Sequence, residues 1–126
     1  QFKAMLNNRL KAAEKQNVKI VFGSDIYIDF EMPRGDAAKN VFVAYLDAGI
    51  QPQKVLQYAT INAAEFMGAK DKLGVLKPKA FADIVAYKGD LEKDFKAIFN
   101  KADFVTKHGK VIINKAAKDS NPISKN

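Results

Sequence analysis

The spacing of apolar residues predicts an amphipathic helix at the start of the chain, followed by a buried strand. The residues that share one face of this helix are Phe2, Met5, Leu6, Leu10 and Ala13. Asn17 ends the helical pattern, and Val18 begins a run rich in β-branched residues that stops at Gly23 and leads to Asp25. A run of this type and length is typical of a strand buried on both faces, as in a parallel sheet. Helix, short turn and buried strand together indicate part of an α/β repeat.

Two further helices are predicted after this strand. Asp36 is expected to cap the first of them, because a short acidic side chain there precedes apolar positions that follow the helical period. Gly49 is expected to end it, since glycine readily adopts the left-handed conformation found after helices. Pro52 suits the first turn of the next helix, where its missing N–H has no partner to lose.

A helix break is predicted at Thr60–Asn62. Asn62 and Glu65 have the spacing of a capping box, with asparagine in place of the usual serine or threonine. The short helix that would start there is expected to end at Gly68.

The period of the apolar residues then changes from that of helices to that of strands. Gly74 begins a turn region, and His108–Gly109 supplies a tight turn. The predicted elements are a strand over 82–87, a small helix over 91–99, and a hairpin with strands over 104–106 and 111–113. Residues 115–126 are polar and lack apolar periodicity, so we expect a mobile tail.

Length and composition set limits on the kinds of chemistry. The 126 residues, 48% hydrophobic and 28% charged, suffice for one modest globular domain but not for two. The absence of cysteine excludes disulfides, thiolate metal sites and cysteine nucleophiles. His108 is the single histidine, so the chain cannot by itself supply the several histidine ligands that zinc enzymes use. No apolar run approaches the ~20 residues that span a bilayer.

The net charge of +7 raises the question of nucleic acid as a partner. Nearly all of the excess is lysine scattered along the chain, and only Arg9 and Arg34 carry guanidinium groups. Arginine is the usual agent of bidentate recognition of bases and phosphates, so its scarcity favours a solvated surface and argues against nucleic acid.

Asp25 is the main candidate for chemistry. In parallel sheets and barrels the active site forms where strands end, and a carboxylate there can bind a metal or accept a proton. The alternative is that Asp25 only caps a turn. The segment after it contains Tyr27, Phe30 and Arg34, which can line a substrate pocket. The alternatives there are packing over the end of the sheet and, for Arg34, a surface charge.

Four segments resemble the C-terminal part of the metal-dependent amidohydrolase superfamily, especially its imidazolonepropionase and Xaa-Pro dipeptidase-like branch. They are Val18–Asp25 (a β-rich run ending in Gly-Ser-Asp), Ala59–Ala64 (Ala-Thr-x-Asn-x-Ala), Gly74–Leu76 with Ala82–Val85 (Gly-x-Leu and Ala-Asp-Ile-Val), and Val105–Val111 (the closing hairpin). The chain departs from the family pattern at Pro78–Asp83, which lacks the usual Pro-Gly-Lys, and at Arg34–Gly35, where many relatives have His-Gly.

The resemblance implies an α/β fold: the last βα unit or units of a (β/α)8 barrel plus strands of a small adjoining β-sandwich. Residues 1–73 would belong to the barrel, 74–114 to the sandwich and 115–126 to the tail. It also implies hydrolysis of a C–N bond, in an amide or cyclic amide, by a metal-activated water. Asp25 would be a metal ligand and the proton shuttle, while histidines on earlier strands would supply the other ligands.

Because a complete barrel needs roughly 200 residues or more, we expect this chain to be one segment of a larger enzyme. Its expected cofactor is a divalent metal, with zinc the first candidate, and the segment alone is expected to be inactive and to hold no metal tightly. The expected partners are an amide or dipeptide-like substrate and the remainder of the barrel or another protomer. Two alternatives remain at this point: a non-catalytic α/β module for association with another chain, and a basic nucleic-acid-binding domain.

Overall fold

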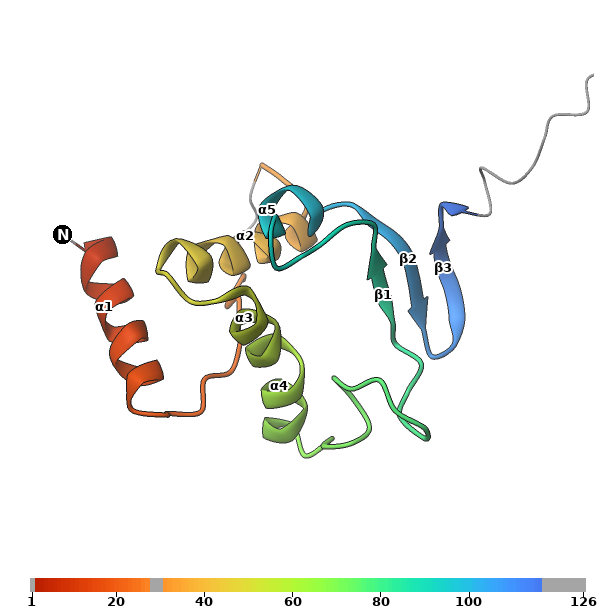
Figure 1. Cartoon of the computed structure of the whole chain (residues 1–126), viewed down its shortest axis with the longest axis horizontal. Helices are drawn as coiled ribbons and strands as arrows, with labels where there is room; N and C mark the ends of the chain where they lie inside the picture. The colour runs from red at the N-terminus through yellow and green to blue at the C-terminus, as the bar shows by residue number, and fades with distance from the viewer. Residues whose placement is uncertain (1, 28–30, 117–126) are drawn as a thin grey trace, which may run out of the picture. The chain divides into compact units, whose positions relative to one another are not determined.

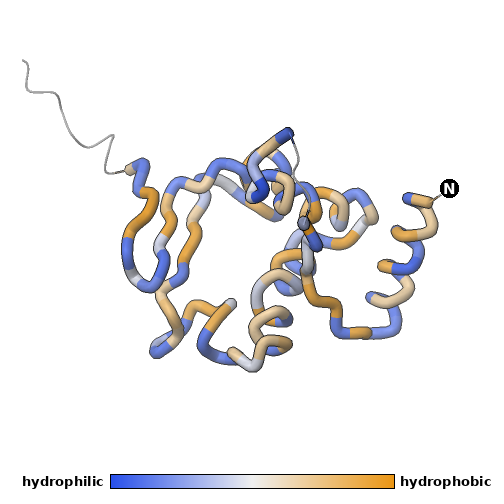
Figure 2. The backbone as a smooth tube through the Cα atoms, turned by 180° about the vertical axis from the view of Figure 1, so that it is seen from behind, coloured by the Kyte–Doolittle hydropathy of each residue, from blue (hydrophilic) through white to orange (hydrophobic). Residues whose placement is uncertain are grey.

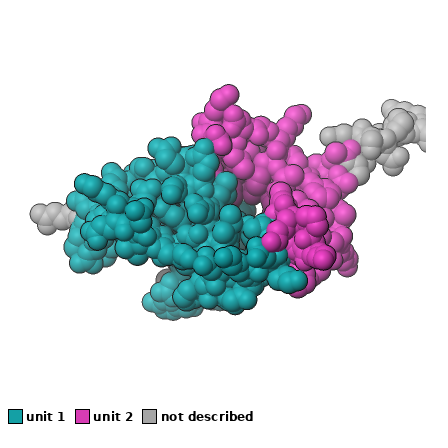
Figure 3. Space-filling view, turned by 60° about the horizontal axis from the view of Figure 1, so that its bottom comes forward, with its two compact units in different colours: residues 1–75 teal, residues 76–126 magenta. Residues whose placement is uncertain are grey.

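A computed structural model of the chain describes residues 2–27 and 31–116. The chain divides into two compact units, residues 1–75 and 76–126 (Figure 3). Unit 1 contains α1 (Phe2–Lys15), α2 (Arg34–Asp47), α3 (Pro52–Ala59) and α4 (Ile61–Phe66) (Figure 1). Unit 2 contains β1 (Val85–Tyr87), α5 (Phe95–Ile98), β2 (Ala102–Lys107) and β3 (Lys110–Asn114). The predicted tail lies outside the described residues, except for its first two.

Three helices of unit 1 end in the same way, at the three residues where the sequence predicts a stop. Asn17, Gly49 and Gly68 have φ values of 55°, 89° and 70°. In each case the next residue donates its N–H to the carbonyl five residues earlier; at α1, Val18 donates to Ala13 at 3.0 Å. This is the Schellman arrangement, which satisfies carbonyls that the last helical turn leaves without a partner. The predicted ends are confirmed.

The predicted start of α2 is wrong by three residues. The helix begins at Arg34 and Pro33 is its N-cap, while Asp36 lies inside the first turn. The carbonyl of Pro33 accepts the N–H groups of Asp36 and Ala37 at 2.9 and 3.1 Å, so the helical bonds are already formed before Asp36 could cap them. Asp36 instead pairs with Lys39 at 2.9 Å.

The capping box predicted at Asn62 is also wrong, although the break at Thr60 is confirmed. Thr60 separates α3 from α4 with φ −119° and ψ −85°. Asn62 is the second residue of α4 and its side chain bonds to another part of the chain. Pro52 occupies the first turn of α3 as predicted.

The strand predicted from Val18 to Asp25 is not formed. Residues 18–27 are irregular, and no described strand runs beside them. Two backbone groups of this segment bond to the α3–α4 region instead: the N–H of Phe22 donates to the carbonyl of Tyr58 at 3.1 Å, and the carbonyl of Ile20 accepts from Asn62. The apolar run correctly indicated contact with a core, but periodicity reports burial and not strand pairing.

The core of unit 1 is centred on Ile50, Val55 and Tyr58. Partly buried residues pack around these three: Leu10, Ile20, Phe22, Phe42, Tyr45 and Leu46. The rings of Phe22 and Phe42 lie 4.2 Å apart, which fixes the segment after α1 against α2. Helix α1 contributes less to this core than predicted, because Phe2 is exposed. Figure 2 shows the hydropathy of each residue along the chain.

Unit 2 is built on an antiparallel sheet with strand order β1-β2-β3. The turn between β2 and β3 consists of His108 and Gly109, with φ values of 50° and 75°. Positive φ at both central residues is the type I′ geometry that matches the twist of a hairpin. The hairpin is confirmed, and the strand predicted over 82–87 is formed only at Val85–Tyr87. The predicted helix is shorter than expected, and its buried Phe95 stacks on Phe99 with ring centroids 4.6 Å apart.

Candidate functional site

Asp25 lies in the irregular segment after Phe22, and its side chain is exposed. Its φ of 47° places it in the left-handed region. Non-glycine residues adopt this conformation rarely, although aspartate tolerates it better than most. Such conformations cost energy and are enriched at functional sites, so the backbone at Asp25 is consistent with a chemical role.

Two residues of the predicted substrate wall are exposed to solvent. Tyr27 is 80% exposed, and Arg34 is an exposed first residue of α2. Phe30 lies outside the described residues. The segment that follows Asp25 in the sequence therefore exposes an aromatic and a cationic side chain to solvent. Its role in substrate binding stays a prediction.

Asp25 is not part of a multi-residue metal site within the parts of the chain that are described. There, no three His, Cys, Asp or Glu residues come together in a group that could hold a metal ion. His108 lies in the hairpin turn of unit 2, where its ring meets the ring of Phe81 edge-on at 5.5 Å. Asp25 can thus supply one carboxylate donor to a metal, and the described residues do not complete the coordination.

The segment that carries Asp25 is tied to α3 and α4 by three polar contacts. The side-chain amide of Asn62 donates to the carbonyl of Ile20 at 2.8 Å, and the N–H of Phe22 bonds to Tyr58. In addition, Lys19 pairs with Glu65 at 2.8 Å and lowers the pKa of that carboxyl. Sequence reasoning singled out Asn62 and Glu65 but assigned them to a helix cap, because nothing local indicates a partner about forty residues away.

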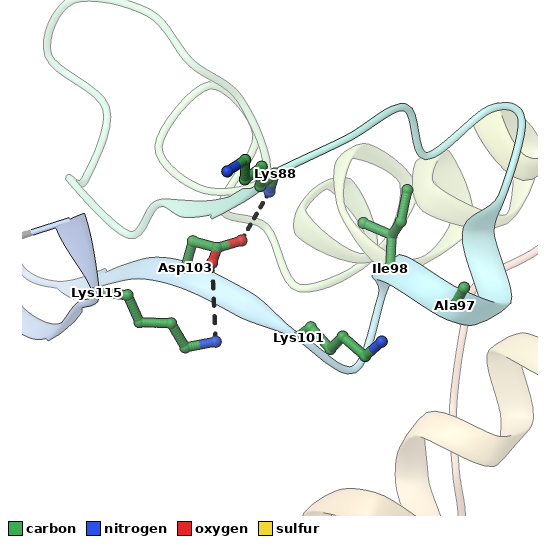
Figure 4. Close-up of a pocket in the computed structure, with 6 residues that line it drawn as sticks. All are labelled: Lys88, Ala97, Ile98, Lys101, Asp103 and Lys115. Carbon is green, nitrogen blue, oxygen red and sulfur yellow. Dashed lines mark hydrogen bonds and ion pairs between the residues drawn. The ribbon is translucent and has the colours of Figure 1, made fainter. Parts of the chain in front are cut away.

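Unit 2 has an open cavity of about 380 Å³ that contains none of the predicted site residues. Its lining consists of Lys88, Ala97, Ile98, Lys101, Asp103 and Lys115 (Figure 4). The carboxylate of Asp103 already accepts the N–H of Lys88 at 2.7 Å and faces the ammonium of Lys115 at 3.8 Å. The cavity is therefore a basic surface hollow whose single acid is engaged in structural contacts.

Asp83, from the Ala-Asp-Ile-Val segment, has a structural role that its motif did not reveal. Its carboxylate accepts the N–H of His108 at 2.6 Å and pairs with the ammonium of Lys107. Together these two contacts lower its pKa, the His108 N–H contributing most. Beside it, the hydroxyl of Thr106 donates to the carbonyl of Ala82 at 2.7 Å. These bonds attach the segment before β1 to the hairpin.

We expect Asp83 to make the stability of the chain depend on acid pH. Because its pKa is lowered by folding, its contribution to the free energy of unfolding is complete above its unfolded pKa of about 3.9 and is lost as pH falls through the folded pKa. Urea unfolding monitored by circular dichroism should show this loss below about pH 4, and Asp83→Asn should reduce it. An Asp83→Asn chain with an unchanged acid slope would contradict this assignment. Glu65→Gln serves as the comparison, because the pKa of Glu65 is lowered by lysines, chiefly Lys19 and also Lys70, with no backbone N–H contributing.

The order of the segments can now be compared with known proteins. The sequence model of the amidohydrolase family matches residues 4–114, which is most of the chain. The chain belongs to the amidohydrolase family. This confirms the resemblance that rested on four short motifs, and it places the chain in a family of hydrolytic enzymes.

Individual relatives are much longer than this amidohydrolase chain. It is similar to adenine deaminase 1 of Carboxydothermus hydrogenoformans, with 32% identity over 89 residues that make up 67% of the chain and 15% of the deaminase. It is also similar to the crystal structure of an amidohydrolase, with a TM-score of 0.72, 26% identity and coverage of 86% of the chain and 26% of that protein. A prolidase complexed with N-methylphosphonate-L-proline gives a TM-score of 0.44 at 21% identity over 68% of the chain and 30% of the prolidase, too low to support an argument.

The comparisons agree with an α/β fold carrying a small antiparallel sheet. In the portion of the chain that is described, no helix is both long and apolar enough to cross a membrane.

Proposed function

We propose that this chain is part of a metal-dependent hydrolase that cleaves C–N bonds of small molecules, either amides or cyclic amides. The observation that supports this most directly is the family match over residues 4–114, which includes the segment that carries Asp25. Adenine deaminase 1, by its name, removes an amino group from adenine, and that reaction also breaks a C–N bond. An exocyclic amine therefore belongs among the substrates to be tested.

Asp25 has two roles in this proposal. Its carboxylate is one ligand of a divalent metal, with zinc the first candidate, and the remaining ligands come from residues outside this chain. When bound, such an ion lowers the pKa of a water molecule towards neutrality. Asp25 accepts the proton that the attacking water gives up and passes it to the leaving nitrogen, whose departure requires protonation. Its side chain is exposed, so it can face a substrate at this position.

The same proposal assigns residues 1–73 to the C-terminal part of a (β/α)8 barrel and residues 74–114 to strands of an adjoining β-sandwich. In support, the chain spans only 15% of the deaminase and 26% of the matched amidohydrolase. Residues 18–25 would form the last barrel strand when neighbouring strands, from the rest of the barrel or another protomer, complete the sheet. Tyr27, Phe30 and Arg34 would then contact the substrate from the loop after that strand.

Metal removal tests the proposed function. We expect the complete enzyme to lose hydrolysis of its substrate after treatment with a chelator and to regain it when zinc is added. The assay should follow release of amine or ammonia from a panel containing an N-acyl amino acid, an Xaa-Pro dipeptide, a cyclic amide and adenine, with metal content measured on the same samples. Turnover that persists after the metal content has fallen to background would refute the metal-dependent reaction.

A further inference from the structure

Asn62 is a buried polar residue whose role the helix around it does not explain. It lies in α4 with 8% of its surface exposed, yet its side-chain amide bonds to no neighbour in that helix. The amide donates to the backbone carbonyl of Ile20, 42 residues earlier, at 2.8 Å. A buried donor costs free energy when it is unpaired, and the bond itself is partly shielded from water, so it is costly to break from the side of Asn62.

The hydrogen bond from Asn62 to Ile20 restrains the segment that carries Asp25. In Figure 1 the chain that follows α1 runs beside α3 on its way to α2. Ile20 and Phe22 are two residues apart, and both are bonded to the α3–α4 region, Ile20 through Asn62 and Phe22 through the carbonyl of Tyr58. Asp25 follows only three residues later. The path of the backbone into Asp25 is therefore set by what holds Ile20 and Phe22.

Among the polar side-chain contacts that hold this segment, the hydrogen bond from Asn62 is the better shielded from water. The other polar side-chain contact, between Lys19 and Glu65, involves groups that are 55% and 39% exposed, and the contacts of Phe22 with Phe42 are apolar. Exposed ion pairs contribute little, because water and salt screen them. The amide of Asn62 is shielded from water, and amides have a fixed, directional donor geometry.

We propose that Asn62 is a positioning residue for Asp25: by holding the carbonyl of Ile20 it fixes the segment that presents the Asp25 carboxylate to the metal and the water. This inference rests on the proposed function of Asp25. It assigns to Asn62 no contact with substrate or metal.

The first test uses the 126-residue chain and needs no activity. Asn62→Leu keeps the branching at Cγ and removes the donor. We expect the amide of Phe22, which bonds to Tyr58, to exchange with solvent at least about tenfold faster in this variant, as measured by NMR hydrogen exchange. Thr60→Val is the matched control, since it removes a hydroxyl that bonds at 2.7 Å to Leu56 in the same helix junction without touching the Ile20 segment. Unchanged exchange at Phe22 in Asn62→Leu would overturn the inference.

A second variant decides the matter if Asn62→Leu does not fold. Asn62→Asp keeps the shape but replaces the donor by a carboxylate, which repels the carbonyl of Ile20 when ionised. We expect loss of protection at Phe22 near neutral pH and its recovery as the pH falls through the pKa of the new carboxyl, because the protonated acid can again donate. Protection at Phe22 that stays at the level of the unsubstituted chain near neutral pH would overturn the inference.

The last test asks whether Asn62 acts through Asp25. In the complete enzyme we expect Asn62→Leu to lower kcat about 10–100-fold with a small change in KM, and to have no further effect when Asp25 is already Asn. A merely structural role would lower kcat in both backgrounds, and that result would overturn the inference. If Asp25→Asn itself leaves kcat unchanged, the proposed function fails, whereas the exchange result at Phe22 still reports on the tether.

Discussion

Replacing Asp25 by Asn in the complete enzyme is expected to lower kcat about 10²–10⁴-fold, the usual contribution of a positioned acid–base group. Asparagine has the same shape and also tolerates the left-handed backbone that Asp25 adopts, with φ 47°. The amide cannot accept the proton of the attacking water, and it is a weaker metal ligand. Because the side chain is exposed, the free energy of unfolding should change by no more than about 0.5 kcal/mol.

Asp71 provides a matched control for this substitution. It is an exposed aspartate of the same unit, and its φ of 64° is also left-handed. Asp71→Asn should leave kcat and KM unchanged, so that a loss confined to Asp25→Asn is specific to that position. Steady-state kinetics and metal content of both variants decide the matter: near-normal turnover of Asp25→Asn with full metal content would exclude Asp25 as the proton shuttle.

Replacing Gly74 by Ala is expected to destabilise unit 1 by about 2–4 kcal/mol, the sum of a left-handed backbone penalty and a steric clash. Gly74 has φ 70°, and a Cβ atom there would lie 2.5 Å from the carbonyl oxygen of Thr60 and 3.0 Å from the nitrogen of Ile61. Both contacts are to backbone, so no side chain can rotate away. The clash falls on the junction between α3 and α4, from which Asn62 reaches Ile20.

Gly68→Ala separates the two contributions. Gly68 has the same φ of 70°, but a Cβ atom there would meet nothing within 4 Å. It should therefore cost only the backbone penalty of about 1–2 kcal/mol. Urea unfolding of both variants, followed by circular dichroism, measures the difference in their free energies of unfolding. A Gly74→Ala chain no less stable than Gly68→Ala would show that the backbone of the α3–α4 junction can shift at little cost.

The features that could be predicted from the sequence are those determined by a few neighbouring residues. Asn17 and Gly49 end helices because each adopts a left-handed backbone, and His108–Gly109 forms the hairpin turn for the same reason. Family membership was also predictable, because four short motifs in a fixed order are specific even when each alone is weak.

One wrong prediction reflects the local path of the backbone, and the others depend on partners far away in the chain. Asp36 was expected to cap α2, but the carbonyl of Pro33 already receives the first helical bonds. Asn62 has the spacing of a cap and instead bonds to Ile20, and Asp83 bonds to the hairpin turn 25 residues later. The strand expected at Val18–Asp25 requires neighbouring strands, which local periodicity cannot supply.

The long separation between Ile20 and Asn62 also has a kinetic consequence. A bond across 42 residues closes a long loop, and closing it costs entropy before the bond can repay it. The helices between them, whose contacts are local, can form earlier. We therefore expect the stretch leading to Asp25 to become ordered late during folding, after those helices.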